Sequence, residues 1–443
     1  MKKNRWTSYF NILLFLVPLF FLGTLNFSMP NKPTVSQLES RTLKTKPTFA
    51  LNKLFSGELT REYEEYFADT FIFRENFVKI SGKIKELWAL PGSDNVTLVI
   101  NKGANVAEVQ KDKDNSPPTS NNSDDNEDLK QGNEENENPN TTNINNEDEQ
   151  AKGEVLGRVL VLNDKAMEIH TFNAAACEYY ASFLNSFQEK LNDNNISVYS
   201  LLAPTQIEFV TNKRYRNLSS PQKKTIEYVN KNFNTKIIPI NAYDALKPNT
   251  DKYLYFRSDH HWTALGAYYA YTAFMKTKGI EPIPLERYEV EQVSPYLGSL
   301  YSTTLGSKIR ENPDTVFLYK PFIAHEYTVY YEGPLQTALL DMSHAKNKNK
   351  YGIFLSGDRP WGRITTEIKN DRKIVIIKDS YANAFVPFLL PHYEEIYIVD
   401  PRQFKLNIFQ FIKDKGIQEV LFLNYILVTD HNGFTDLLKQ MSK

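Results

Sequence analysis

The chain has 443 residues, a formal net charge of -1, 41% hydrophobic residues and 24% charged residues. Its 26 Tyr and 28 Phe are ample for a sizeable core, which excludes a wholly disordered chain. The single cysteine, Cys177, excludes an intramolecular disulfide and a Cys-rich zinc module. A net charge near zero also argues against a dedicated nucleic-acid binder.

Residues 1–29 are predicted to form a short cytoplasmic stub and a signal anchor. Lys2, Lys3 and Arg5 precede an apolar run over about 6–27. Its uncharged centre is intermediate in length between a signal-peptide core of about 7–15 residues and a bilayer span of about 20. Because no clear cleavage site follows, we expect an uncleaved anchor with its basic end inside. The alternative is a cleaved signal and secretion. In both cases the rest of the chain would be extracytoplasmic, as in an exported bacterial protein.

Residues 30–50 lack periodicity and are predicted to be a juxtamembrane tether, followed by one domain over 51–443. The segment 111–152 interrupts that domain with 11 Asn, 12 acidic residues, four Lys and no aromatic residue. Such a segment cannot bury enough apolar surface to fold, so we expect a disordered acidic insert. Its charge of -8 leaves about +7 for the remainder, which would suit a polyanionic wall polymer or reflect ordinary scatter.

Periodicity predicts a helical region over 51–88 and a short strand over 95–101. From Gly157 onward, strands and helices alternate. The predicted strands are 158–162, 197–202, 236–240, 373–378, 395–399 and 419–423, and the predicted helices are 174–191, 221–232, 263–278, 382–390 and 404–415. This alternation indicates an α/β fold with a mainly parallel sheet covered on both faces. The Tyr-rich stretch 288–364 breaks the pattern and suggests an antiparallel excursion.

The string Asp259-His260-His261-Trp262 lies just before a predicted helix. An Asp two residues before a His can turn back and accept the Nδ1 proton, which leaves Nε2 as a base. Three other interpretations stay open at this stage, one of which is that Ser258 or Thr263 simply caps a helix, which is compatible with catalysis. Asp259, His260 and His261 could ligate a metal, although neighbouring side chains rarely converge, and His260 could serve only as scaffolding.

A second constellation follows the β-branched run 373–378, which ends in Asp379-Ser380 directly before a predicted helix. Ligands of open α/β sheets bind beyond the carboxyl ends of the strands, and a helix N-terminus offers free N–H groups to an oxyanion. An isolated Ser at this place could equally be a helix cap. A nucleophile, a base and an orienting carboxylate are nevertheless all present, as Ser380, His261 and Asp259.

At these residues the sequence resembles the DHHW family, which is named after the string at 259–262. More widely it resembles the extracytoplasmic proteins of alginate and cell-wall polysaccharide O-acetylation, which have an SGNH-hydrolase-like, flavodoxin-like fold. Other segments that match in the same order are Glu39–Leu43, Glu65–Asp69 with Phe73-Arg74, Asp379–Asn383 and Val399–Arg402. The resemblance covers about 36–443 without the acidic insert.

The resemblance implies Ser380 as nucleophile, His261 as base and Asp259 as its orienter. In these proteins the Asp-x-His precedes the Ser, the reverse of ordinary SGNH esterases, as in a circular permutation. Arg402 and Trp262 are candidates for contact with sugar or polymer charge, and Trp262 is equally well explained by packing.

The expected oxyanion donors are the N–H groups of the nucleophile and of Tyr381. The resemblance also proposes Gly357 as the SGNH glycine and Asn383 as the SGNH asparagine, with Asn424 as a weaker alternative. One departure stands out, because Lys378 replaces the first residue of the usual Gly-Asp-Ser.

The implied function is an O-acetyltransferase that acts on a surface or secreted polysaccharide through an acetyl-serine intermediate. It would need no metal or organic cofactor, and a membrane-bound O-acyltransferase would supply the acetyl groups. The alternatives are a polysaccharide acetyl esterase with the same triad and a non-catalytic carbohydrate-binding or assembly protein.

Overall fold

The computed structural model describes residues 5–29, 32, 35–36, 41–42, 44–55, 57–74, 153–191 and 196–443. The acidic insert and the strand expected at 95–101 lie outside the described residues. So does the last part of the helical region expected at 51–88. In its described part, α2 (Leu51–Phe55) and α3 (Glu58–Thr70) confirm the helical prediction.

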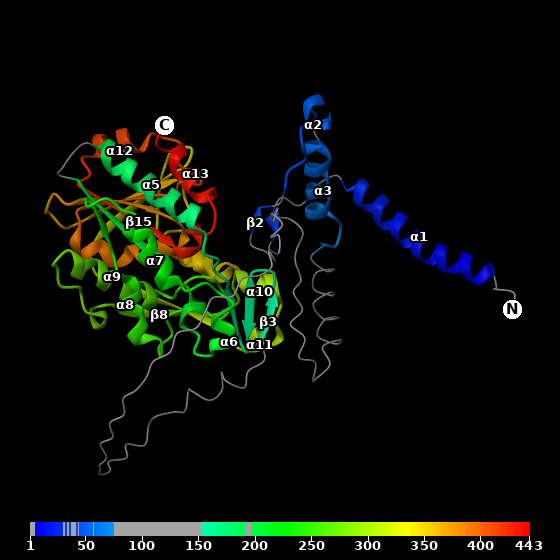
Figure 1. Cartoon of the computed structure of the whole chain (residues 1–443), viewed down its shortest axis with the longest axis horizontal. Helices are drawn as coiled ribbons and strands as arrows, with labels where there is room; N and C mark the ends of the chain where they lie inside the picture. The colour runs from blue at the N-terminus through cyan, green and yellow to red at the C-terminus, as the bar shows by residue number, and fades with distance from the viewer. Residues whose placement is uncertain are drawn as a thin grey trace, which may run out of the picture.

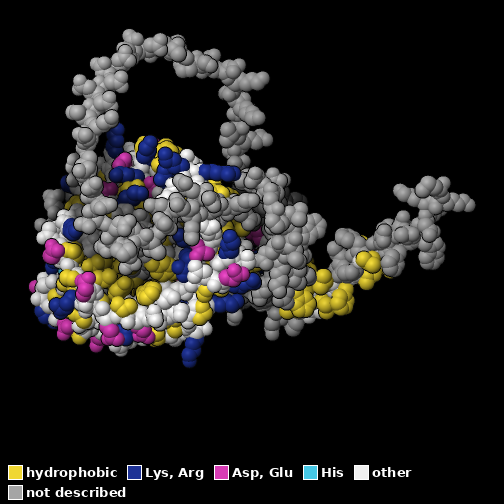
Figure 2. Space-filling view, turned by 90° about the horizontal axis from the view of Figure 1, so that it is seen from below, with side chains coloured by type: hydrophobic (Ala, Val, Ile, Leu, Met, Phe, Trp, Pro, Cys, Tyr) yellow, Lys and Arg dark blue, Asp and Glu magenta, His cyan; other side chains and the backbone are white. Residues whose placement is uncertain are grey.

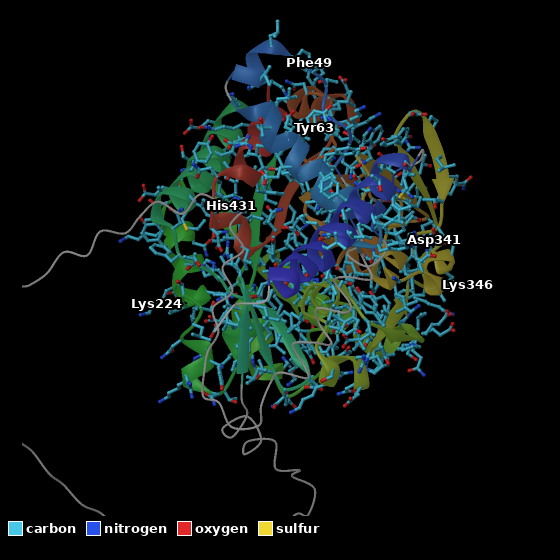
Figure 3. The ribbon with its side chains drawn as sticks, turned by 90° about the vertical axis from the view of Figure 1, so that its right-hand side faces the viewer. Phe49, Tyr63, Lys224, Asp341, Lys346 and His431 are labelled. Atoms are coloured by element: carbon cyan, nitrogen blue, oxygen red, sulfur yellow. The ribbon has the colours of Figure 1, made fainter. Side chains whose placement is uncertain are left out.

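The chain begins with α1 (Arg5–Ser28) and a two-stranded pair, β1 (Val35–Ser36) and β2 (Arg41–Thr42). The predicted membrane anchor is not supported by the structure. Within the described ranges, no helix is both long enough and apolar enough to cross a bilayer. The helices α1, α2 and α3 stand apart from the α/β body in Figure 1, and Figure 3 shows Phe49 and Tyr63 on this outlying segment.

An eight-stranded sheet forms the centre of the body. Its order is β11-β10-β12-β14-β13-β15-β6-β7. The five strands from β14 to β7 are parallel, whereas β12, β10 and β11 are antiparallel to their neighbours. Their bounds are β6 Ser197–Ala203, β7 Ile237–Pro239, β10 His325–Tyr330, β11 Pro334–Thr337, β12 Trp361–Thr366, β13 Lys373–Lys378, β14 Glu395–Val399 and β15 Glu419–Tyr425. The mainly parallel sheet and the antiparallel excursion are both confirmed.

The parallel strands have a permuted order. Counted from β13 as the first strand, the five run 2-1-3-4-5 across the sheet, which is the order of flavodoxin-type sheets. The chain therefore enters this sheet at the strand that would be fourth. The Asp-x-His string comes after β7, the fifth strand in that count, and Ser380 comes after β13, the first. The Asp-x-His string therefore precedes the Ser along the chain because the strands themselves follow a permuted order.

Two hydrophobic cores flank the sheet, as the alternation along β13 shows. Ile374 and Ile376 join one core with α8 (Ala242–Leu246) and α9 (Ala264–Thr277). Val375 and Ile377 join the other core, whose helices are α5 (Ala174–Leu191), α7 (Gln222–Lys231), α12 (Ile408–Lys415) and α13 (Gly433–Gln440). Figure 1 shows α5, α12 and α13 on one side of β15 and α8 and α9 on the other. A strand buried on both faces reads as a continuous apolar run, as β13 does.

Two sequence predictions need correction. The strand expected at 158–162 is not part of the main sheet, because β3 (Gly153–Leu156), β4 (Val159–Leu162) and β5 (Lys165–Glu168) form a separate antiparallel sheet. Two-residue turns at Gly157 and Asn163, with φ of +63° and +55°, fold these strands back on each other. The helix expected at 382–390 consists of two 3-10 segments, η6 (Ser380–Ala384) and η7 (Val386–His392). Pro391, inside η7, lacks the N–H that an α-helix needs at that position.

The antiparallel excursion also contains β8 (Glu289–Tyr296) and β9 (Asp314–Lys320), which pair with each other around α10 (Ser299–Thr304) and α11 (Ser307–Glu311). The remaining short helical segments are η1 Gln206–Phe209, α6 Lys213–Arg216, η2 Lys247–Asn249, η3 Leu285–Arg287, η4 Met342–Lys346, η5 Lys350–Ile353 and η8 Ile426–Thr429. Lys224 on α7 and Asp341 beside η4 lie on opposite sides of the body, as do the edge strands β7 and β11 (Figure 3). Both signs of charge occur on the face shown in Figure 2.

Candidate active site

The buried carboxylate of Asp314 anchors the backbone that leads into Asp259–His261. Asp314 accepts hydrogen bonds from the N–H groups of Arg257 and Ser258 at 2.9 and 2.8 Å. It also accepts from the hydroxyls of Ser258 and Tyr253. Because four donors converge on this carboxylate, the backbone before the Asp-x-His string has little freedom.

Asp259, His261 and Ser380 form a continuous chain of hydrogen bonds. His261 Nε2 lies 2.6 Å from Ser380 Oγ, and His261 Nδ1 lies 2.5 Å from Asp259 Oδ1. The Asp259 carboxylate turns back as the spacing suggested, and it also accepts the His261 backbone N–H at 3.0 Å. The chain order Asp, His, Ser therefore converges into the geometry that nucleophilic catalysis requires.

The second oxygen of Asp259 is held as firmly as the first. Asp259 Oδ2 accepts from the Tyr296 hydroxyl and the Ser299 N–H, both at 2.8 Å. Burial disfavours the charged form of this carboxyl. The neighbouring His261 and His260, with the hydrogen bonds, outweigh burial and hold the pKa of Asp259 well below its usual value. The group is therefore an ionised acceptor at neutral pH.

Gly298 lets the chain approach this carboxylate closely. A Cβ at Gly298 would lie 2.3 Å from Asp259 Oδ2 and 2.4 Å from Asp259 Cβ. Any side chain at this position would therefore displace the Asp259 carboxylate or the Ser299 N–H that binds it. A glycine is therefore needed at position 298 because there is no room for a Cβ, and not because of its backbone dihedral angles.

The His261 ring lies between two other rings. Tyr351 stacks on it at a centroid distance of 3.8 Å and an interplanar angle of 10°, and the Tyr351 hydroxyl donates to the Ser380 carbonyl at 3.0 Å. The His260 ring lies 3.8 Å away, with its Nδ1 2.8 Å from Ser299 Oγ. Burial, together with the charge of His261, lowers the pKa of His260. These contacts fix the plane of the base.

The metal alternative rests on the same three residues. Asp259, His260 and His261 offer ligand atoms within 4.8 Å of one another. Both Nδ1 atoms and His261 Nε2 are already engaged, with Ser299, Asp259 and Ser380. The arrangement therefore fits a proton-transfer chain better than a ligand set.

Ser380 stands at the first position of η6, immediately after β13. Asp379 caps this turn, since its Oδ1 accepts the Tyr381 N–H and its Oδ2 accepts the Tyr425 N–H, both at 2.9 Å. Burial raises the pKa of Asp379 from 3.8 to about 6. The first N–H of a helix has no partner within that helix, so the Ser380 N–H remains suited to an oxyanion.

Two of the predicted oxyanion donors are already used within the fold. The Tyr381 N–H is held by Asp379, and the Gly357 N–H donates to the Phe354 carbonyl at 3.1 Å. Gly357 has φ of +81° in a turn, which explains the glycine by its conformation. Of the expected backbone donors, the Ser380 N–H alone makes no hydrogen bond among the described residues.

The two asparagine candidates are also engaged. Asn383 donates its amide to Asp358 Oδ1 at 3.0 Å, and Asn424 accepts from the Tyr180 hydroxyl at 3.0 Å. Both side chains are buried. Asn383 Oδ1 and Asn424 Nδ2 are buried and make no hydrogen bond among the described residues.

Lys378 is buried and pairs with acidic groups behind the nucleophile. Its Nζ lies 2.7 Å from Asp358 Oδ1 and 3.7 Å from Asp400 Oδ2. Burial opposes the charge of Asp358, but Lys378 and Arg402 outweigh it and hold the pKa of Asp358 well below its usual value. The lysine that replaces the usual glycine therefore belongs to an internal ion cluster.

The two residues considered for sugar contact also turn inward. Arg402 donates to Asp400 Oδ1 at 2.8 Å and to Asp358 Oδ2 at 2.8 Å. Trp262 is fully buried and donates its indole N–H to the Tyr381 carbonyl at 2.8 Å. This burial agrees with the packing interpretation of Trp262.

Several residues of the site were not foreseen from the sequence, namely Tyr296, Ser299, Tyr351 and Asp358. All four lie in the Tyr-rich stretch 288–364, where only an unusual number of tyrosines marked the region. Asp358 follows the predicted Gly357 directly. No spacing rule links these residues to the triad, because tertiary contacts bring them there.

Comparison with known proteins places the chain in a family. The profile described as "DHHW protein" matches residues 93–399. A solved structure of a DHHW family protein from Eubacterium siraeum is 30% identical, with a TM-score of 0.59 over 65% of this chain and 97% of that one. The chain belongs to the DHHW family.

Two structures of PatB1 from Bacillus cereus are also similar to this DHHW protein, and one of them carries a sulfonyl adduct. They are 21% and 22% identical, each with a TM-score of 0.53, and cover 63% and 64% of this chain and 96% and 99% of theirs. At that identity the likeness concerns the fold alone. No curated protein matches the chain.

Proposed function

We propose that this DHHW protein is an SGNH-type O-acetyltransferase that acts on polysaccharide hydroxyls through an acetyl-Ser380 intermediate. The observation that carries the proposal is the hydrogen-bonded chain from Asp259 through His261 to Ser380, with distances of 2.5 and 2.6 Å. The permuted 2-1-3-4-5 strand order supports the SGNH assignment, because it brings both motifs to the carboxyl ends of parallel strands.

In the first half-reaction, Ser380 Oγ attacks the carbonyl carbon of an acetyl donor while His261 Nε2 takes the hydroxyl proton. Asp259 accepts the Nδ1 proton of the imidazolium in a hydrogen bond and stabilises its charge. The Ser380 N–H would donate to the oxyanion. The donor's leaving group then departs with the proton from Nε2.

In the second half-reaction, a sugar hydroxyl takes the place of the leaving group. His261 Nε2 accepts the hydroxyl proton, the sugar oxygen attacks the acetyl carbonyl, and Ser380 Oγ leaves and regains that proton. Water in the same position would give an acetyl esterase. The two activities therefore share every step of acylation and differ only in the acceptor.

The location and partners form part of the same proposal. The basic residues and apolar run at 2–27 favour export of the body to the extracytoplasmic face. Acetyl groups would then have to cross the membrane, so a multispanning O-acyltransferase is the proposed donor partner. The acceptor is a surface or secreted polysaccharide.

The test compares the full chain with Ser380→Ala and with Ser186→Ala, which alters an exposed serine on α5. Each protein is treated with phenylmethanesulfonyl fluoride and its intact mass is measured. Each is then given a chromogenic acetyl ester with and without acceptor glycans. We expect the sulfonyl adduct and ester turnover in wild type and Ser186→Ala, and a loss of turnover of at least about 10³-fold in Ser380→Ala.

The products separate the alternatives. Acetylated glycan that depends on Ser380 establishes transfer, whereas acetate released to water alone establishes an esterase. Equal behaviour of wild type and Ser380→Ala would overturn the triad assignment and favour a carbohydrate-binding or assembly role.

A further inference from the structure

One acidic side chain beside the site has no use in the mechanism described so far. Glu168 is the last residue of β5, the strand whose Ala166 N–H donates to the Arg257 carbonyl at 2.8 Å. The next residues along the chain after Arg257 lead into the Asp-x-His string. The strand that carries Glu168 therefore runs directly alongside the loop that carries the base.

The alternation of strand side chains directs Glu168 toward α10. Ala166 packs in one small core with Leu300 of α10, and side chains two residues apart share a face of a strand. Glu168 consequently faces the same side as Ala166. Ser299, at the start of α10, binds both Asp259 and His260. The face of β5 that carries Ala166 and Glu168 therefore lies next to α10, whose Ser299 contacts Asp259 and His260.

The Glu168 carboxylate is left without a partner there. Its Oε2 is buried and makes no hydrogen bond among the residues that the structure describes. A buried carboxylate oxygen in this state is costly, so its presence calls for an explanation. Burial raises the pKa of Glu168, and His260 is the largest charge that opposes this rise, as expected for neighbours.

An aromatic surface completes the same corner. Tyr425 is half-buried, its ring stacks on Tyr381 at 5.2 Å and 24°, and it lies 6.3 Å from the His260 ring. After burial, the charge of Glu168 is the largest contribution that raises the pKa of Tyr425. His260 and Tyr425 thus offer two amphipathic rings 6.3 Å apart in the neighbourhood of an unpaired carboxylate oxygen.

This combination matches the chemistry of a sugar. Aromatic rings pack against the C–H faces of a pyranose, and the two oxygens of a carboxyl group can each bind a sugar hydroxyl. We propose that Glu168, His260 and Tyr425 form the acceptor subsite, in which the Glu168 carboxylate binds adjacent hydroxyls of the carbohydrate. The proposal rests on the proposed function and assigns the residues that select its second substrate.

The test measures acetyl transfer to a sugar acceptor separately from the reactivity of Ser380. Wild type, Glu168→Ala and Glu168→Gln are compared with Glu189→Ala, which alters an exposed carboxylate on α5. The first readout is the rate of sulfonyl adduct formation with phenylmethanesulfonyl fluoride. The second is the amount of acetylated sugar formed from a chromogenic acetyl ester with cellobiose, N,N′-diacetylchitobiose or digalacturonic acid, as a function of sugar concentration.

We expect Glu168→Ala to raise the acceptor KM about tenfold or more, as for the loss of a hydrogen bond to a charged group. The fold-increase in the acceptor KM should exceed any fold-decrease in the rate of adduct formation by at least about fivefold. Glu168→Gln, which keeps one acceptor oxygen, should fall between wild type and Glu168→Ala, and Glu189→Ala should match wild type. Equal losses in both readouts together with a lower melting temperature would show a structural role and overturn the proposal.

A binding experiment keeps the inference testable if no acetyl transfer is found. Saturation-transfer NMR of the same three disaccharides is recorded with Ser380→Ala and with the double variant Ser380→Ala/Glu168→Ala. Binding that is weakened about tenfold by the second change supports the subsite even without transferase activity. Unchanged binding, or no binding of any of the sugars to Ser380→Ala, overturns the subsite while leaving the nucleophile test intact.

Discussion

Single residues set the position of His261. Asp259 accepts four hydrogen bonds, from His261 Nδ1, the His261 N–H, the Tyr296 hydroxyl and the Ser299 N–H. The His261 ring is also stacked on Tyr351. Because the carboxylate and the ring are each held from several directions, small displacements of either should be costly to the chemistry.

Gly298→Ala tests this at the point of closest approach. The new Cβ would lie 2.3 Å from Asp259 Oδ2, so the carboxylate must move. We expect the rate of sulfonyl adduct formation at Ser380 to fall at least about tenfold, with a loss of unfolding free energy of about 1–2 kcal/mol. Mass spectrometry and urea denaturation measure the two effects.

Gly333→Ala is the matched control, because a Cβ added at Gly333 would have no atom within 4 Å among the described residues. It should leave the adduct rate and the stability at their wild-type values. A Gly298→Ala protein that reacts as fast as this control would show that the Asp259 position does not limit the nucleophile.

At the scale of elements, β13 joins the core to the site. Its apolar residues face both cores, and the next residue of the strand, Lys378, ends it with a buried charge. Lys378 binds Asp358, which also holds the Asn383 amide and Arg402. The cluster thus links the turn at Gly357 to β13, the strand that precedes Ser380.

Lys378→Met tests the cluster. The change leaves the half-buried carboxylate of Asp358 and the buried carboxylate of Asp400 with Arg402 as their remaining cation in this group of contacts. Removing one member of a buried ion pair costs about 3 kcal/mol or more. We therefore expect urea unfolding to show a loss of about 3 kcal/mol and a slower adduct reaction at Ser380.

Lys373→Met provides the comparison on the same strand. Lys373 pairs with Glu395 at 3.4 Å at the partly exposed start of β13. An exposed pair contributes about 0–1 kcal/mol, so this variant should unfold nearly as wild type does. Equal stabilities of Lys373→Met and Lys378→Met would contradict a structural role for the buried cluster.

At the scale of the whole molecule, polar groups inside the core make stability depend on pH. His392 of η7 is buried, and its Nε2 lies 2.7 Å from the Tyr271 hydroxyl of α9. Burial, with the charges of Arg372 and Lys278, lowers the pKa of His392 from 6.5 to about 4. The native protein therefore keeps this ring neutral where an unfolded chain would protonate it.

Stability should accordingly fall as the pH falls from about 6.5 toward about 4. In that window the unfolded state binds the proton and the native state does not. We expect this group to account for about 2 kcal/mol of the difference in unfolding free energy between pH 7.5 and pH 4.5. His392→Gln should flatten the dependence by that amount, as measured by urea denaturation at several pH values.

His431→Gln is the control, since His431 is exposed and lies beside the C-terminal helix (Figure 3). It should leave the pH dependence unchanged. A His392→Gln protein with the same slope as wild type would show that other groups govern acid sensitivity.

Local patterns in the chain were enough to predict the α/β class and most elements of the body, and they singled out Asp259, His261 and Ser380, which the fold brings together. Periodicity was sufficient for α5 and β13, because an amphipathic helix and a strand buried on both faces have distinct patterns. The Asp-x-His spacing was sufficient for the bond from His261 to Asp259, because that contact is local. Periodicity did not predict the separate antiparallel sheet of β4 or the 3-10 character of η6 and η7. These features depend on neighbouring turns and, in η7, on a proline, which hydrophobic periodicity does not take into account.

The rest of the site depends on tertiary contacts. Tyr296, Tyr351 and Asp358 reach the triad from segments far from it along the chain, so no local pattern marks them. Tyr381, Asn383 and Arg402 had the right residue types for substrate contact, yet the fold uses their donors internally. Whether a polar group faces substrate or core depends on which partners surround it after folding, and no single position of the sequence contains that information.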